Sequence, residues 1–342
     1  MTQITLTRPD DWHLHLRDGP TLASTVPFTA KQFSRAIVMP NLSPPITKVG
    51  MAEDYRERIL QTLASDSKFQ PLMTIYLTDH TQVSDIEQAS NSSVVYAAKL
   101  YPAGATTNSA NGVTDPSKLT TIFEAMQKYQ LPLLVHAEVT DNDVDIFDRE
   151  QVFIDRYLSS IRQQFPELPI VLEHATTSQA IDFVKEHKRT AATITPQHLL
   201  FNRNDLLAGG LHPHNYCLPI LKRESHRQSL VQAATSGNAK FFLGTDSAPH
   251  STQAKQTSCG CAGCFSAHAA IELYTEFFDH AKALDKLEGF ASHFGADFYG
   301  LPRNKEKITL IKESWQAPLT YPFAGETLTP FRQEIPLQWK IK

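Results

Sequence analysis

Eight short apolar segments recur through the first three quarters of the chain, and each ends in polar residues. They cover residues 11–16, 35–41, 71–79, 94–102, 131–138, 169–175, 191–196 and 240–250. Helical patterns lie between them, with apolar residues three or four apart, as in Met51, Tyr55, Ile59 and Leu63, or Leu119, Ile122, Phe123 and Met126. Strands that alternate with helices predict a parallel sheet, and eight such units predict an α/β fold closed into a (β/α)8 TIM barrel.

The last part of the chain breaks this pattern. From about residue 302 the sequence is punctuated by prolines, is rich in Thr and Phe, and has no clear helical period. We expect residues 302–342 to form a short irregular or β-containing C-terminal extension. A length of 342 residues would allow two domains, but a barrel of this kind routinely occupies about 250 residues or more. We therefore expect residues 1–342 to form a single barrel domain.

The composition is that of an ordinary soluble globular chain. Apolar residues make up 41% and charged residues 20%, and a net charge of -4 without a basic cluster argues against a nucleic-acid partner. The first residues lack a basic segment followed by an apolar one, and no apolar run approaches the ~20 residues that span a bilayer. We expect a cytoplasmic protein with no membrane partner. Four cysteines are too few for a disulfide framework in a chain this long.

The segment DWHLHLRD, residues 11–18, contains the first candidate site. Side chains alternate between the two faces of a strand. An apolar set is therefore expected on one face, formed by Trp12, Leu14 and Leu16. A polar set is expected on the opposite face, formed by His13, His15 and Arg17. That polar face must meet a ligand or a polar partner.

In a (β/α)8 barrel the active site lies at the carboxyl ends of the strands, so the residues at those ends are the most informative. Several predicted strands end in an imidazole, an amine or a carboxylate, namely His13, His15, Lys99, His136, His174 and Asp246. Alternation predicts that these side chains face inward, Lys99 with Val95 and Ala97, His174 with Ile170 and Leu172, and Asp246 with Phe242 and Gly244. Imidazoles and a carboxylate are ligands suited to zinc or a similar divalent ion.

Single signals of this kind are weak, and only their combination is specific. A lone H-x-H pair in a strand is more often satisfied by hydrogen bonds than by a metal. His212 and His214 form such a pair in a loop punctuated by Gly and Pro, and we assign them no function. His198 follows the seventh strand, and its simplest interpretation is a capping or packing residue. Four histidines and an aspartate at four strand ends do not arise readily by chance, and they favour a metal centre.

Lys99 is the member of this set that does not suit a cation site. An ammonium group there would repel a metal and would be costly to bury. One interpretation is a lysine that reaches solvent or pairs with a carboxylate. The other is that burial lowers its pKa, the neutral amine reacts with carbon dioxide, and the resulting carbamate bridges two metals. The sequence does not decide between them.

The stretch CGCAGC suggests a different hypothesis, a zinc or iron–sulfur module. It supplies three thiols, Cys259, Cys261 and Cys264, and the only possible fourth ligand, Cys217, is distant and unpaired in the sequence. The favoured interpretation is a tight Gly and Ala loop whose backbone approaches a ligand, with the cysteines as small hydrophobes.

Together these motifs resemble a known family. HLHLR, the MPN of the second segment, YPAGATTNSANGV around Lys99, the histidines that end segments five and six, NYCLPILK, GTDSAPH and CGCAGCF are similar to those of dihydroorotase in its short stand-alone bacterial type, within the amidohydrolase superfamily. The similarity runs over nearly the whole chain. No motif position departs from the family pattern.

The resemblance implies two zinc ions per subunit. His13, His15 and Asp246 would bind one zinc and His136 and His174 the other, with a hydroxide and carboxylated Lys99 (N6-carboxylysine, formed from carbon dioxide) as bridges. The family's substrate-binding positions correspond to Arg17, Asn41, Leu218, His250 and Ala262, and those of its mobile substrate-covering loop to Thr106 and Thr107. A homodimer is implied by the family alone.

The activity implied by the resemblance is the reversible cyclisation of the small molecule N-carbamoyl-L-aspartate to L-dihydroorotate, with loss of water, in pyrimidine (UMP) biosynthesis. In the hydrolytic direction the bridging hydroxide attacks the ring amide and Asp246 acts as general acid and base. Two alternatives stay open. One is another cyclic amidohydrolase, of the hydantoinase or dihydropyrimidinase kind, which would have no use for the carboxylate binders Arg17, Asn41 and His250. The other is a non-catalytic barrel, which the complete ligand set disfavours.

Overall fold

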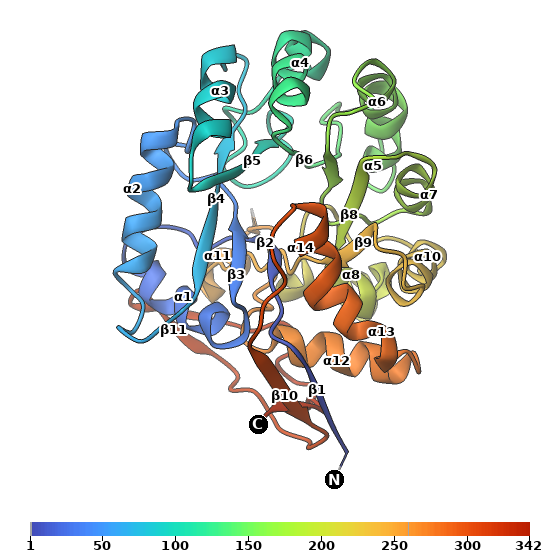
Figure 1. Cartoon of the computed structure of the whole chain (residues 1–342). Coiled ribbons are helices and arrows are strands. Elements are labelled where there is room, and N and C mark those ends of the chain that lie inside the picture. The colour runs from blue at the N-terminus through green and yellow to red at the C-terminus, as the bar shows by residue number, and fades with distance from the viewer. Residues whose placement is uncertain (1, 259) are drawn as a thin grey trace.

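Eight parallel strands form the centre of the computed structural model, which describes residues 2–258 and 260–342 (Figure 1). Each strand pairs with the next one along the chain, in the order β2-β3-β4-β5-β6-β7-β8-β9. Their bounds are β2 Asp11–Leu14, β3 Arg35–Val38, β4 Gln70–Tyr76, β5 Val95–Leu100, β6 Leu133–Val135, β7 Ile170–Leu172, β8 Thr190–Ile194 and β9 Phe241–Leu243. Each overlaps one of the predicted segments, and the prediction of a (β/α)8 barrel is confirmed.

The helices surround the strands (Figure 1). They are α1 Leu22–Gln32, α2 Val49–Leu60, α3 Val83–Asn91, α4 Thr120–Tyr129, α5 Arg149–Phe153, α6 Ser159–Gln164, α7 Ser178–Glu186, α8 Pro196–Leu200, α9 Arg203–Leu207, α10 Glu224–Thr235, α11 Thr252–Lys255, α12 Ala270–His280, α13 Leu284–Glu288 and α14 Phe294–Phe298. The predicted apolar spacing holds in α2, where Tyr55 and Ile59 are buried, but this helix ends before Leu63.

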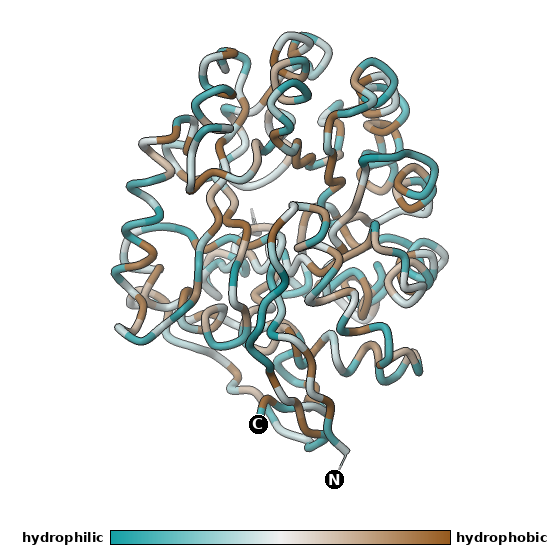
Figure 2. Tube along the Cα trace, in the orientation of Figure 1, coloured by the Kyte–Doolittle hydropathy of each residue, from teal (hydrophilic) through white to brown (hydrophobic). Residues whose placement is uncertain are grey.

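Apolar and hydrophilic positions interleave along these helices (Figure 2), and most of the longer helices turn their apolar positions toward the strands. Of the helices in the described part of the chain, none combines the length and hydrophobicity that crossing a membrane requires.

One apolar side chain from each strand fills the barrel interior. These eight are Trp12, Ile37, Leu72, Ala97, Leu134, Val171, Ala191 and Phe242. Helix α14 and the residues after it pack against this layer, and the Trp12 ring stacks on that of Tyr299 with centroids 4.7 Å apart. The amino-terminal part of the barrel is therefore closed by packing, and polar chemistry is left to the opposite end.

The predicted alternation is wrong at three strands. In β5, Val95 packs in the outer core and Ala97 in the inner layer, because the pairing of β5 with β4 shifts register between them. Trp12 lies in the inner layer, whereas Leu14 belongs to the outer core, because the pairing of β2 with β3 shifts register between Asp11 and Leu14. The single polar face expected for DWHLHLRD therefore does not exist as a regular strand face. In β7 the inward residue is Val171, while Ile170 and Leu172 pack outward. His174 does not share an inward face with them.

The barrel closes where β2 meets the segment after β9. The Asp246 N–H donates to the His13 carbonyl at 2.9 Å, and the His15 N–H donates to the Ser247 carbonyl at 3.1 Å. The buried Asp11 carboxylate accepts from the Thr245 N–H at 2.8 Å and from the Thr245 hydroxyl at 2.6 Å. We call this set of contacts, from Asp11 to His15 and from Thr245 to Ser247, the barrel seam.

The two ends of the chain meet in a small antiparallel sheet beside the barrel (Figure 1). It consists of β1 Gln3–Thr7, β10 Lys307–Ile311 and β13 Lys340–Ile341, and β11 Tyr321–Phe323 pairs with β12 Glu326–Leu328. The prediction of a β-containing C-terminal extension is confirmed, but the partnership with β1 was not predicted. Helix α12 holds the extension through buried Glu276, which pairs with Arg332 at 2.9 Å.

Gly295 in α14 tests how tightly the closed end of the barrel is packed. A Cβ at this position would lie 2.1 Å from the indole nitrogen of Trp12. We expect Gly295→Ala to lower the free energy of unfolding by about 1–3 kcal/mol, because overpacking outweighs the better helix propensity of alanine. Urea denaturation measures the change. Gly50→Ala in α2 is the matched control, since its Cβ would meet nothing within 4 Å, and equal stability of the two variants would contradict the packing argument.

Candidate metal and substrate site

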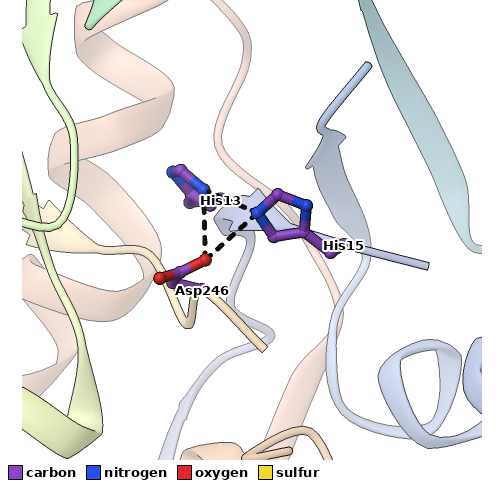
Figure 3. A group of neighbouring side chains, drawn as sticks. All are labelled: His13, His15 and Asp246. Carbon is purple, nitrogen blue, oxygen red and sulfur yellow. Dashed lines mark hydrogen bonds and ion pairs between the residues drawn. The ribbon is translucent and has the colours of Figure 1, made fainter. Parts of the chain in front are cut away.

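Three predicted ligands lie together at the carboxyl end of the barrel. The Nε2 atoms of His13 and His15 are 3.3 Å apart, and Oδ1 of Asp246 lies 3.4 Å from the first and 3.1 Å from the second (Figure 3). All three side chains are buried. The barrel seam brings them together, because it joins the ends of β2 and β9. One imidazole nitrogen from each histidine and one carboxylate oxygen converge, which is a ligand arrangement for a divalent ion.

The remaining imidazoles continue this cluster. The His174 ring lies 5.0 Å from that of His13 and 4.7 Å from that of His136, measured between centroids. Lys99 Nζ lies 4.9 Å from the ring centroid of Tyr101, which itself contacts the His136 ring. The ends of β2, β5, β6, β7 and β9 thus deliver all the residues predicted to form the metal centre to one place.

Backbone conformation, rather than strand alternation, directs three of the predicted site residues toward the cluster. Arg17, His174 and Asp246 have positive φ angles of 62°, 42° and 43°. Non-glycine residues rarely adopt this region, and they do so mainly where surrounding contacts impose it. The His174 N–H is held by the Thr193 hydroxyl at 2.7 Å, and Asp246 is held by the barrel seam. This turn explains how His174 reaches the site although it follows the outward-facing Leu172.

Lys99 is fully buried, and no hydrogen-bond partner for its Nζ is found within the described chain. Burial lowers the pKa of this amine to about 8, although the negative charges of Glu173 and Asp246 oppose the shift. The interpretation that Lys99 reaches solvent is therefore wrong. A lowered pKa increases the fraction of unprotonated amine, which is the form of a lysine that reacts with carbon dioxide.

The electrostatics of the cluster suit a cation. Burial alone would raise the pKa of Asp246, but His13 and His15 hold it well below its usual value, so the carboxylate is charged. Burial and the neighbouring His136 lower the pKa of His174 well below its ordinary value, so this imidazole is a neutral potential ligand. Its Nδ1 is buried and has no partner among the described residues. Nitrogen and oxygen donors of this kind fit zinc.

The predicted substrate residues surround a small cavity beside the cluster. Its volume is about 20 Å³, and its lining includes His15, His136, His174, Asp246, Arg17, Asn41, Thr106, Thr107, Leu218 and Ala262. The cavity is nearly closed, because the Asn41 side-chain amide donates to the Thr107 carbonyl at 3.0 Å and Asn108 donates to the Asn41 carbonyl at 3.0 Å. The segment with Thr106 and Thr107 therefore lies over the site.

Arg17 is positioned by the segment that follows β9. Its Nε donates to the Pro249 carbonyl at 2.9 Å, and its Nη2 lies 2.8 Å from Nε2 of His250. The Tyr55 hydroxyl donates to the Arg17 carbonyl and fixes the backbone there. His250 is not among the cavity-lining residues, and it lies behind the guanidinium. A fixed guanidinium in a cavity lined by imidazoles can bind a carboxylate next to a metal.

The cysteines do not form a metal group within the described chain. Cys259 lies outside the described residues. The three described cysteines are free thiols, and two of them, Cys217 and Cys264, are buried in an apolar cluster. Lys255, which looks from the sequence like an ordinary loop lysine, is buried and donates from Nζ to the carbonyls of Tyr216, Cys261 and Gly263. The backbone around Ala262 is thereby held at the cavity wall, as expected for a loop that approaches a ligand.

The other histidines behave as the sequence suggests. His198 is buried between the Thr195 hydroxyl at 2.7 Å and the Pro219 carbonyl at 2.9 Å. This is a packing role. His212 and His214 lie away from the metal cluster, beside a separate surface pocket.

Sequence reasoning missed three buried carboxylates at the site, Asp11, Glu138 and Glu173. Asp11 belongs to the barrel seam. Glu138 lies 2.7 Å from the His136 ring, and Glu173 lies 2.7 Å from the His13 ring. A usable signal existed, since Glu138 follows His136 by two residues and Glu173 follows the inward-facing Val171 by two, so alternation points both into the barrel.

The barrel and its donor cluster define the class of protein. A parallel (β/α)8 barrel with imidazoles, a lysine and an aspartate at the carboxyl ends of its strands is the architecture of metal-dependent barrel hydrolases. The chain matches the Amidohydrolase family over residues 10–324. A dihydroorotase from Alcanivorax borkumensis is 60% identical to it over 339 residues, which are 99% of this chain and 98% of that protein.

Solved structures agree with this classification. A dihydroorotase from Campylobacter jejuni has a TM-score of 0.91 and 35% identity, covering 99% of this chain and 97% of its own. A dihydroorotase from Saccharomyces cerevisiae in complex with 5-fluoroorotic acid has a TM-score of 0.89 and 33% identity, covering 100% and 99%. An L-hydantoinase from Arthrobacter aurescens has a TM-score of 0.80 but only 13% identity, and shares the fold alone. The chain belongs to the amidohydrolase family and, within it, to the dihydroorotases.

Proposed function

We propose that this chain catalyses the reversible cyclisation of N-carbamoyl-L-aspartate to L-dihydroorotate, with loss of water. The observation that carries the proposal is the placement of Arg17 and Asn41 in the same small cavity as His15, His136 and Asp246. A carboxylate-binding guanidinium next to a cation site fits a substrate that has both a free carboxylate and a cyclic amide. A hydantoin lacks that carboxylate, and this difference disfavours the hydantoinase alternative.

The cofactor of this proposal is a pair of zinc ions per subunit. His13, His15 and Asp246 would hold one ion and His136 and His174 the other, with Lys99, carboxylated by carbon dioxide, between them. Bound zinc would lower the pKa of a water molecule and polarise the amide carbonyl. The buried, unpartnered Lys99 Nζ and the unpartnered His174 Nδ1 support this assignment.

The chain's own residues would bind, enclose and protonate the substrate. Arg17, backed by His250, binds the free carboxylate together with Asn41, while backbone groups of Leu218 and Ala262 contact the ring. Thr106 and Thr107 cover the cavity and exclude water from it. Asp246 is the general acid and base. In ring opening its carboxylate takes a proton from the attacking water and passes it to the departing ring nitrogen. In ring closure it takes a proton from the carbamoyl nitrogen and passes it to the departing water.

We further propose that residues 1–342 act as one barrel unit, as a homodimer in the cytoplasm, in the pyrimidine (UMP) biosynthetic pathway. The full-length similarity to dihydroorotases supports the pathway. The net charge of -4 is consistent with a small-molecule substrate and with no nucleic-acid or membrane partner.

Ring opening of L-dihydroorotate by purified protein, followed as loss of ultraviolet absorbance, tests the activity. We expect activity to disappear when a chelator removes the metal and to return when zinc is restored, because bound zinc would lower the pKa of the attacking water and polarise the amide. Hydantoin and dihydrouracil are the comparison substrates. Zinc-loaded, folded protein that turns over a hydantoin but not dihydroorotate would overturn the proposal.

Arg17→Met tests recognition of the substrate carboxylate. Loss of a charge-assisted contact of about 1.5–3 kcal/mol predicts a decrease of roughly 10- to 100-fold in kcat/KM, mainly through KM. The zinc content should stay that of the wild type, because Arg17 contacts Pro249 and His250 rather than the ligand cluster. Steady-state kinetics and metal analysis measure both. Loss of zinc in this variant would assign Arg17 a structural role instead.

Lys99→Ala tests the carboxylated lysine. We expect this variant to lose both zinc and activity, because no other described side chain takes the place of Nζ in the cluster. Lys128→Ala, on the exposed face of α4, is the matched control. Lys255 is unsuitable as a control, because its Nζ holds the loop at the cavity wall. Full zinc occupancy in Lys99→Ala would refute the assignment.

A further inference from the structure

Two buried glutamates at the metal cluster have no role in the mechanism above. Glu138 is 1% exposed and Glu173 is 0% exposed. Glu138 Oε2 lies 2.7 Å from Nε2 of His136, and Glu173 Oε2 lies 2.7 Å from Nδ1 of His13. Each carboxylate therefore engages one ring nitrogen of one predicted ligand, and at His13 this is the nitrogen opposite the one that faces His15 and Asp246.

The two glutamates engage opposite ring nitrogens. A charged carboxylate accepts hydrogen bonds only, so it requires a proton on the nitrogen that it contacts. His136 must then carry its proton on Nε2 and present the lone pair of Nδ1. His13 must carry its proton on Nδ1 and present Nε2, which is the atom that faces His15 and Asp246. The sequence gives no reason to expect different tautomers at two equivalent ligands.

Glu173 is held in place by a second connection. The Thr193 hydroxyl donates to Glu173 Oε2 at 2.6 Å, and the same hydroxyl accepts from the His174 N–H at 2.7 Å. Thr193 lies in β8, next to the strand that carries Glu173. One hydroxyl thus joins the carboxylate that orients His13 to the backbone that turns His174 into the site.

The charge of the two glutamates also points to a cation. Glu138 Oε1 and Glu173 Oε1 are buried without a hydrogen-bond partner, and within the described chain neither side chain forms an ion pair with lysine or arginine. A buried carboxylate whose only ion-pair partner is an imidazole is costly unless further positive charge lies nearby. A metal on the opposite nitrogen of each imidazole would supply that compensation across the ring.

We infer that Glu138 and Glu173 are positioning residues that set the tautomers of His136 and His13, so that Nδ1 of the first and Nε2 of the second are the metal-binding atoms. This inference depends on the metal site of the proposed function but not on the identity of the substrate. Carboxylates in this position typically raise metal affinity by about 10- to 100-fold.

Nitrogen NMR of the zinc-loaded, full-length protein labelled with ¹⁵N-histidine tests the inference directly. We expect His136 to show its ring proton on Nε2 and His13 to show its ring proton on Nδ1. Glu138→Leu should remove the defined His136 tautomer and weaken zinc binding, measured by chelator competition, by about 10- to 100-fold. Glu173→Leu should do the same for His13.

The conservative variants separate positioning from general damage. Glu138→Gln and Glu173→Gln keep an acceptor oxygen, so they should preserve the tautomers and lose less zinc affinity than the leucine variants. Glu276→Gln changes an equally buried glutamate in α12, far from the cluster, and should leave tautomers and zinc affinity unchanged.

The outcomes distinguish this inference from the proposed function. The opposite tautomer at either histidine in the wild-type protein would overturn the inference, as would leucine variants with unchanged tautomers and zinc affinity. If the tautomers are as expected but dihydroorotate is not hydrolysed, the inference stands and the proposed substrate is wrong.

Discussion

The site depends on the closure of the barrel between its first and last strands. The β-sheet hydrogen bonds across the seam are made by the same residues, His13, His15 and Asp246, whose side chains form the donor cluster. Asp11 reinforces the seam with two hydrogen bonds to Thr245. If the seam opened, the three side chains of the donor cluster would separate. Structural integrity and metal binding are therefore inseparable at this point.

The rest of the site is held by a framework of buried polar contacts on a rigid apolar base. The apolar base consists of one side chain from each strand, and α14 packs against that layer. On this base, the Thr193 hydroxyl holds the backbone of His174, and the Glu173 carboxylate holds the ring of His13. The positive φ angles of His174 and Asp246 are sustained because several contacts over-determine them. A flexible surface could not hold several imidazoles in such fixed orientations.

Much of this arrangement is predictable from the sequence. Period-2 apolar runs separated by helical spacing locate all eight strands, and the rule that function lies at their carboxyl ends selects His136, Lys99 and Asp246. Strand alternation fails where the chain departs from regular geometry, at the register shift between Asp11 and Leu14 and at the turned backbone of His174. The pairing of β1 with β10 escapes prediction because it joins distant segments. Glu138 and Glu173 each follow an inward-facing residue by two positions, but that spacing alone does not show that a carboxylate contacts a histidine.

The seam also has a consequence for the order in which the molecule can be completed during synthesis. Asp11 and Thr245 are 234 residues apart, so the segment that pairs with the first barrel strand is made only after nearly three quarters of the chain. Contacts of such long range are slow to form, because a large loop must be closed before they stabilise anything. His13 and His15 are thus synthesised long before Asp246, the third member of their cluster, and the cluster is completed only when the seam forms. A nascent chain exposes two imidazoles and an unpaired strand edge throughout that interval.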